Sequence, residues 1–353
     1  MKFIDYILKR QVRVMKTIAM KKRLAGVLDF LLGRNQKKSR AEIGLRVLFE
    51  KELSDHLNSK RFLILLILIC GTGFASLYGA LSSLWESEEA VEFLFLSLYT
   101  TSGNSIPSFA SFIGLLGPFV GLVLGFDAVN GERNNGTLNR LVAQPIYRDS
   151  VVIGKFLAGT AVISLLVCSM GIIIGAAGVL STGLLPETEE VLRILVFLFY
   201  TIVYIAFWLG LAILFSVLCR HTATSAMAVI ALWLFFAIFM SLFANIIANA
   251  VYPMDTQINM LINSLDNYTL ELNLNRISPY YLYSEVVSTV MNPAVRSINV
   301  VTVSQLEGAI SGYLSFGQSL LLIWPHLVGM LALMLAAFVC SYVGFMRQEI
   351  RSS

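Results

Sequence analysis

The sequence predicts an all-α integral membrane protein with six transmembrane helices, N-terminal amphipathic helices, and an extracytoplasmic cap before the last helix. Three observations predict this fold. First, 57% of the 353 residues are apolar, only 14% are charged, and the mean hydropathy is +0.75, which is far more apolar than a soluble protein. Second, six apolar stretches are long enough to cross about 30 Å of hydrocarbon as helices. Third, positive charge is concentrated in particular connections, as it is in multi-pass proteins.

The pattern of residues 1–40 predicts a basic amphipathic N-terminal extension. Apolar side chains such as Ile4, Ile7 and Leu8 recur at helical spacing, with Lys9 and Arg13 on another face. Such a helix can lie among lipid headgroups with its cations toward anionic lipid. The alternative is a helix packed on a partner or on cytoplasmic loops. After a polar linker, residues 41–61 predict a cytoplasmic connecting helix that abuts the first span.

The transmembrane domain is expected over residues 62–345. Within it the apolar stretches place six spans near 62–84, 109–126, 151–180, 192–218, 223–250 and 319–345. The remaining residues, 346–353, form a short tail.

The connections between spans sort by charge. Sixteen of the 26 Lys and Arg residues precede residue 62, and four lie within 127–155. Segments 85–108 and 181–191 contain no Lys or Arg but carry four and three glutamates. By the positive-inside rule, both termini and segment 127–155 are cytoplasmic, and the protein lies in the cell membrane.

Segment 251–318 is expected on the outer side. It is too long for a turn and too polar for a span, and it contains prolines and clustered tyrosines at Pro253, Pro279, Pro293, Tyr280, Tyr281 and Tyr283. This composition is typical of a small cap over the outer mouth, partly re-entrant or interfacial. A disordered linker is the alternative.

The sequence does not predict an enzyme. It has no GxxxxGK[ST] phosphate-binding motif and no HExxH zinc motif, so we expect no catalytic residue, cofactor or metal in this chain. The middle of each predicted span lacks Asp and Glu, although ion-driven carriers commonly need an acid there. The energy source is therefore expected outside the membrane.

Two features inside the spans have open interpretations. Gly117, Gly121 and Gly125 share one helix face, which favours close packing within the subunit, with a dimer or sliding interface as the alternative. His326 follows Pro325 at membrane depth. It is either a functional polar residue or a partner for a carbonyl that the proline frees.

Segment 127–155, DAVNGERNNGTLNRLVAQPIYRDSVVIGK, is polar and lies between two apolar spans. Its Asn and Gly residues predict turns. Leu138, Leu141 and Val142 then predict a short amphipathic helix that ends before Pro145. Asp149 or Ser150 could cap the next span. The segment is expected to act as a lever on which a soluble partner can push.

These residues resemble the cytoplasmic signature of ABC-2 type permeases, in the branch that includes the nitrous-oxide-reductase maturation and gliding-motility transporters. The matching motifs are Gly131-Glu132-Arg133, Gly136-Thr137-Leu138, Leu141, Gln144-Pro145, Arg148 and Gly154-Lys155-Phe156. The stretches Leu48 to Leu53 and Ile277 to Glu285 are also similar, so the resemblance covers about residues 43–345. Asn134 departs from the family, which often has Glu at this position.

The resemblance implies a permease that pairs with a second copy of itself in membrane lipid and binds two separate ABC ATPase subunits, which carry ATP and Mg. It implies no nucleic-acid partner. Export of a substrate is the expected function. The implied ATPase-coupling residues are Glu132, Arg133, Gly136, Leu138, Leu141, Val142, Pro145 and Arg148, with the glutamate and first arginine in charged contacts and the apolar face in an ATPase groove.

Two alternatives to this function remain. The chain could be a non-transporting membrane scaffold that recruits a soluble complex, or a secondary carrier. The spans leave lipids, drugs, hydrophobic peptides and ions open as substrates.

Overall fold

The computed structural model describes residues 40–86, 93–103, 106–138, 147–299 and 312–348, apart from the side chains of residues 40–43 and 261. Residues from Gly44 onward form one compact unit. The predicted N-terminal amphipathic extension lies outside the described residues. In the described ranges the chain forms helices joined by turns, without a strand, which confirms the predicted all-α class.

Six helical segments of the described chain are long and apolar enough to cross a membrane. Each overlies one of the six predicted spans. In chain order they are α3 (Lys60–Glu86), α5 (Phe109–Gly125), α8 (Arg148–Thr182), α9 (Thr188–Leu218), the continuous run α10 (Thr222–Leu234), η1 (Phe235–Phe239) and α11 (Met240–Val251), and α15 (Phe316–Arg347).

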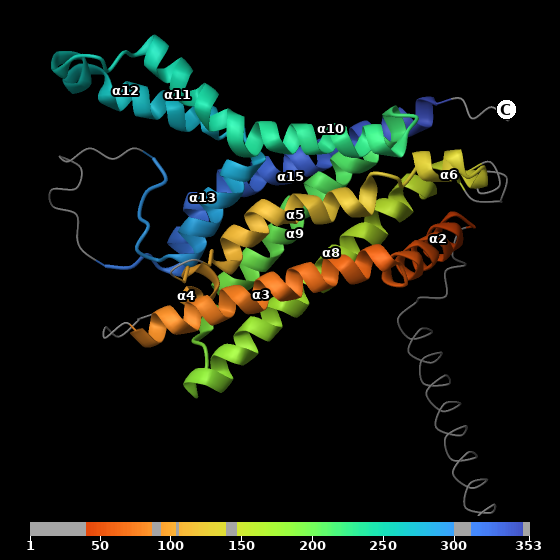
Figure 1. Ribbon diagram of the computed structural model, residues 1–353, viewed down its shortest axis with the longest axis horizontal. Helices are drawn as coiled ribbons and strands as arrows, with labels where there is room; N and C mark the ends of the chain where they lie inside the picture. The colour runs from red at the N-terminus through yellow and green to blue at the C-terminus, as the bar shows by residue number, and fades with distance from the viewer. Residues whose placement is uncertain (1–39, 87–92, 104–105, 139–146, 300–311, 349–353) are drawn as a thin grey trace, which may run out of the picture. The chain divides into compact units, whose positions relative to one another are not determined.

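Shorter helices lie at the two ends of this bundle (Figure 1). At one end are α2 (Arg40–Leu57) and α6 (Asn130–Asn134). At the opposite end are α4 (Leu94–Thr100) and α13 (Pro279–Met291), and α12 (Gln257–Asn275) runs beside α11. The described residues between 252 and 299 therefore contain two helices, α12 and α13. The sequence did not predict α4, which lies within an acidic connection.

Helix α9 is the centre of the bundle and packs against α5, α8, α13 and α15. Its large aromatic side chains Tyr200, Tyr204 and Trp208 are fully buried. The ring of Tyr204 stacks on that of Tyr283 in α13, with 4.4 Å between centroids. Because apolar burial gives little driving force between helices in lipid, such close packing carries much of the association energy.

Glycines allow α5 to approach α9 closely. A Cβ on Gly121 would lie 2.7 Å from both the carbonyl oxygen of Ile205 and the amide nitrogen of Leu209. A Cβ on Gly125 would lie 2.8 Å from the Cβ of Ala212. The predicted glycine face therefore packs within the chain.

Arg193 fastens the first turns of α9 to two other elements. Its buried guanidinium donates hydrogen bonds to the carbonyls of Val290 at 2.8 Å and Leu314 at 2.7 Å, and to Ser319 Oγ at 3.1 Å. Glu189, one turn earlier, supplies the carboxylate at 2.8 Å. The start of α9, the end of α13 and the start of α15 thus share one cation.

A π-helical turn, η1, interrupts the fifth span. A π-helical turn disrupts the regular ladder of backbone hydrogen bonds. Ser278, which caps α13, donates its hydroxyl proton to the carbonyl of Phe236 at 2.8 Å. The polar backbone of the turn therefore anchors α13 to the fifth span.

Replacing Gly121 with alanine tests the close approach of α5 to α9. The added methyl group meets backbone atoms, which cannot rotate away, so we expect a loss of about 1–3 kcal/mol in stability. Thermal unfolding of the detergent-solubilised protein should show a midpoint several degrees lower. Gly71→Ala is the matched control, because no atom lies within 4 Å of its added Cβ. Equal midpoints for the two variants would contradict this packing.

Candidate functional site

A buried ionic network joins three helices at the end of the bundle that carries α2 and α6. Lys155, in the second turn of α8, donates from Nζ to Glu52 Oε2 of α2 at 3.0 Å and to Glu132 Oε1 of α6 at 2.8 Å. The side chains of Lys155 and Glu52 are 5% and 8% exposed. A charge removed from water in this way needs paired partners, so the ammonium holds α2, α6 and α8 together.

Glu52 stays ionised in this network. Its burial alone would raise its pKa, but Lys155 and the neighbouring Lys51 outweigh burial and hold the pKa of Glu52 below its usual value of 4.5. Lys51 Nζ lies 3.0 Å from Glu52 Oε1. The carboxylate of Glu52 is therefore ionised at neutral pH.

The segment that begins at Asp127 is also tied to α9 and α3. Ser216 Oγ, buried on α9, accepts hydrogen bonds from the backbone N–H of Val129 at 2.9 Å and of Asn130 at 3.2 Å. Arg61 of α3 forms an ion pair with Asp127. The hydroxyl satisfies two donors at the start of α6, which have no partner within that helix.

Two arginines connect the segment to the end of α15. Arg133 donates to Oε1 of Gln348. Arg148 donates to the carbonyls of Phe345, at 3.0 Å, and Gln348, and its guanidinium lies 5.2 Å from the centre of the Phe345 ring. Cations near the carbonyl end of a helix are favoured by its dipole. The last turn of α15 is thus fixed to both flanks of the segment.

Within residues 127–138 the exposed stretch is the tip from Asn134 to Thr137, and Tyr147 before α8 is exposed as well. Gly136 adopts a left-handed conformation with φ of +68°, and a Cβ there would meet open space. Helical conformation resumes at Thr137 and Leu138. This tip is the surface that the segment offers to another molecule.

Most of the described residues that we predicted to contact an ATPase instead contact other parts of the same chain. Glu132, Arg133 and Arg148 bind partners within the chain, and the side chain of Leu138 is only 3% exposed. Gly136 alone among the described members of the set lies on the exposed tip. Leu141, Val142 and Pro145 lie outside the described residues. Contact of the set with an ATPase stays a prediction.

Sequence reasoning missed Glu52, Lys155 and Gln348 as members of this site. Glu52 lies in a mixed-charge run, and Lys155 lies at the start of a predicted span. The signal that could have pointed to this site was a lysine followed directly by apolar residues.

The predicted cap of the following span was also wrong. Helix α8 begins at Arg148 after Tyr147, without a side-chain cap. Asp149 instead accepts from the N–H of Ser150 within the first turn.

A second polar cluster lies beside α13. His326 Nε2 lies 2.7 Å from Oε2 of Glu285, and Arg276 binds the same carboxylate at 2.9 Å. Burial raises the pKa of Glu285, but His326 and Arg276 outweigh it and lower the pKa below its usual value. The expected bond from His326 to a carbonyl freed by Pro325 was therefore wrong, because a carboxylate occupies Nε2.

Lys155→Met tests the ionic network. Without the ammonium, two carboxylates remain buried near each other, and breaking a buried pair typically costs about 3–5 kcal/mol. Lys51→Met is the control. Its side chain is 49% exposed, so we expect a change of less than about 1 kcal/mol. Equal effects of the two substitutions on thermal unfolding would contradict the network.

The same variant should reverse the dependence of stability on pH. In the native protein the pKa of Glu52 is lowered, so its contribution is present above pH 4.5 and is lost as pH falls through the folded pKa. In Lys155→Met, burial dominates and raises that pKa, so stability should increase as pH falls from 7 toward 4.5. Unfolding midpoints across this pH range measure the sign of the slope.

Comparison with known proteins identifies the family. The profile of a family described as "ABC-2 family transporter protein" matches residues 46–350. The chain is also similar to two curated proteins named "Probable ABC transporter permease protein NosY". One, from Pseudomonas aeruginosa, is 29% identical over 147 residues, which are 41% of this chain and 52% of that protein. The other, from Stutzerimonas stutzeri, is 31% identical over 143 residues, 40% and 46% of the two chains.

The aligned region spans about half the length of these curated relatives. The family profile covers most of the chain, including α2, the ionic network and all six long helices. The chain therefore belongs to the ABC-2 family of transporter proteins and is a multi-pass membrane protein.

Proposed function

We propose that this chain is the permease subunit of an ABC transporter that exports a substrate across the cell membrane. A separate ABC ATPase, bound in two copies with ATP and Mg, supplies the energy to a pair of permease chains. The observation that carries the proposal is the attachment of segment 127–138 to α3, α8, α9 and the end of α15. Arg61 and Lys155 join it to α3 and α8, Ser216 and Gln348 join it to α9 and the end of α15, and Glu52 extends the network to α2.

These attachments make the segment a lever. Force on the exposed tip, Asn134 to Thr137, reaches α8 through Glu132 and Lys155 and reaches α15 through Arg133 and Arg148. An ATPase that binds the tip differently in its ATP-bound and ADP-bound states shifts the permease between two conformations. ATP hydrolysis takes place in the ATPase, and this chain transmits the resulting conformational change to its membrane helices.

The distribution of charge supports the proposed orientation. The α2 and α6 end contains the lysine- and arginine-rich connections, whereas α4 follows a connection with four glutamates and no cation. The positive-inside rule then places the ionic network and both termini in the cytoplasm. A soluble ATPase would meet the tip on this side.

Site-specific cross-linking tests the partner. We expect a photoreactive residue at Asn135 to capture a P-loop ATPase in intact cells, and one at Ser181, at the far end of α8, to capture none. Both positions are exposed. A captured protein that does not hydrolyse ATP would favour the scaffold alternative, and transport by the purified chain alone in liposomes would favour the secondary carrier.

Glu132→Gln separates binding from coupling. The amide keeps the size of the side chain but weakens its bond to Lys155, since hydrogen bonds between ionised groups are roughly twice as strong as neutral ones. The ATPase should still copurify, while its stimulation by the permease should fall. Glu50→Gln is the control, because Glu50 lies on the exposed face of α2 and, among the described residues, pairs with Arg46 and not with the network. Unchanged stimulation in Glu132→Gln, with normal copurification, would contradict the lever.

A further inference from the structure

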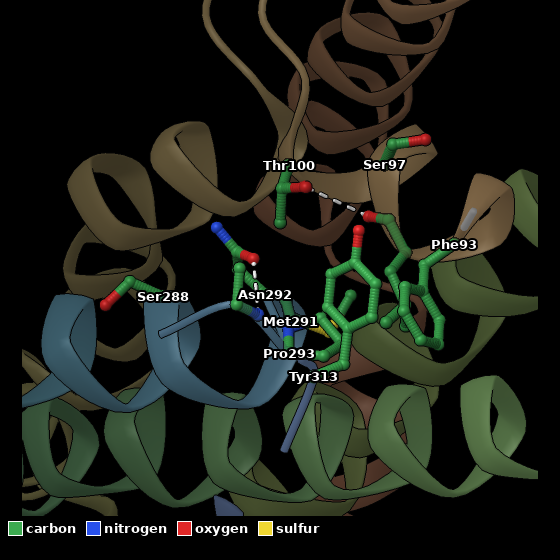
Figure 2. Close-up of a pocket in the computed structure, with 10 residues that line it drawn as sticks. Phe93, Ser97, Thr100, Ser288, Met291, Asn292, Pro293 and Tyr313 are labelled. Carbon is green, nitrogen blue, oxygen red and sulfur yellow. Dashed lines mark hydrogen bonds between the residues drawn. The ribbon is translucent and has the colours of Figure 1, made fainter. Parts of the chain in front are cut away.

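Two adjoining cavities lie along α13 at the end of the bundle opposite the ionic network. The larger, of about 480 Å³, is open to the surface and lies between α4 and the end of α13 (Figure 2). The smaller, of about 200 Å³, lies between α4, α5 and α13. Thr100 and Ser288 line both cavities. The volume of the larger cavity is in the range of small-molecule binding sites.

The lining of both cavities is uncharged in the described part of the chain. None of the lining residues that the structure describes is Asp, Glu, Lys, Arg or His. The rings of Phe93 and Tyr313 pack edge to face with 5.2 Å between centroids and form an aromatic wall, which Figure 2 shows beside Met291. A charged ligand would lose its hydration here without gaining an opposite charge. The cavities therefore favour an uncharged ligand with an apolar part.

The polar groups of the lining favour a ligand that donates hydrogen bonds. The hydroxyls of Ser97, Thr100 and Ser288 each donate to a carbonyl of their own helix, at 2.7, 3.0 and 2.9 Å. Their protons are committed, whereas their oxygen lone pairs can still accept. Asn292 Oδ1 accepts from the N–H of Ala294, which leaves its amide N–H groups as donors. A hydroxyl group, which both donates and accepts, matches this set.

Two side chains of α9 form hydrogen bonds that fix the walls of the larger cavity. Glu190, 4% exposed, accepts from the N–H of Phe95 at 3.0 Å and fixes the start of α4. Arg193, one turn later, binds the carbonyls of Val290 and Leu314, which adjoin the lining residues Met291 and Tyr313. Glu190 and Arg193 of α9 thus hold the start of α4 and the end of α13, whereas the lining residues Asn292, Ala294 and Tyr313 lie in exposed non-helical segments.

We propose that these cavities form a binding site for an uncharged, hydroxyl-bearing amphiphile. Its apolar part lies against Phe93 and Tyr313, and its hydroxyls lie near Thr100, Ser288 and Asn292. This site belongs to the side that the charge pattern assigns to the outside. Its role as a cargo site rests on the proposed export function, whereas binding itself does not.

Cysteine protection tests the site in the permease alone, reconstituted in lipid nanodiscs. Ser288→Cys places a thiol where the cavities meet, in a chain whose four cysteines (Cys70, Cys168, Cys219, Cys340) are replaced by alanine.

The probe is octyl glucoside below its critical micelle concentration. At ten times its dissociation constant it leaves about one site in eleven free, so maleimide labelling should slow about ten-fold. Octyl sulfate and octyltrimethylammonium, with the same chain but a charge, should slow it less than about two-fold.

Three controls decide the outcome. Ser181→Cys, exposed at the end of α8, should label at the same rate with and without each probe. Ala294→Trp, which fills the larger cavity, should remove the protection of Ser288→Cys. Ser97→Cys, which lines the same cavity from α4, should be protected in parallel. Equal slowing by all three probes, equal slowing at Ser181→Cys, or no slowing at either cavity thiol would overturn the site.

The result is independent of the proposed coupling. If the cavity thiols are protected but cross-linking at Asn135 captures no ATPase, the binding site stands and its role in ATP-driven export falls. Coupling to an ATPase without protection would leave the permease function and remove this site.

Discussion

The contacts of Lys155 are the constraint on which the α2 and α6 end of this protein depends. An ammonium that is 5% exposed is compensated here by two carboxylates, Glu52 and Glu132, that lie beside it. Because these carboxylates come from α2 and α6, the two helices cannot leave α8 without exposing or stranding a charge. The arginines at 133 and 148 add the end of α15 to the same assembly. Segment 127–138, which is polar in sequence, is thus held inside the chain by bonds to neighbouring helices and exposes only a small tip among its described residues.

Helix α15 connects the two ends of the molecule through specific bonds. Its last turn accepts from Arg148, its middle binds Glu285 through His326, and Ser319 in its first turn accepts from Arg193. At 1.5 Å per residue its 32 residues extend about 48 Å. Helix α15 is therefore one continuous element that contacts Arg148 at one end and α13 and the start of α9 toward the other. Discrete packed elements of this kind are what carry coupling between distant sites.

The spans could be predicted because apolar length alone defines a helix that crosses hydrocarbon. Helix α4 could not, since seven residues are too few for a periodic pattern and the surrounding connection is acidic. Glu132 and Arg133 could be singled out from their motif, but their partners could not. Glu52 is 103 residues from Lys155, and Gln348 is 215 residues from Arg133. Leu138 carries the expected apolar face, yet the helical pattern does not say whether that face packs on a partner or within the chain.

The buried position of Arg193 has a consequence for how the protein is made. Three of its acceptors, on Val290, Leu314 and Ser319, follow it by 97, 121 and 126 residues. At a synthesis rate of about 5–20 residues per second, they emerge roughly 5–25 seconds after the arginine itself. During this interval Glu189 is the partner already available. The nascent chain therefore inserts α9 with an incompletely satisfied cation, and the bundle closes at this end only when the last helix arrives.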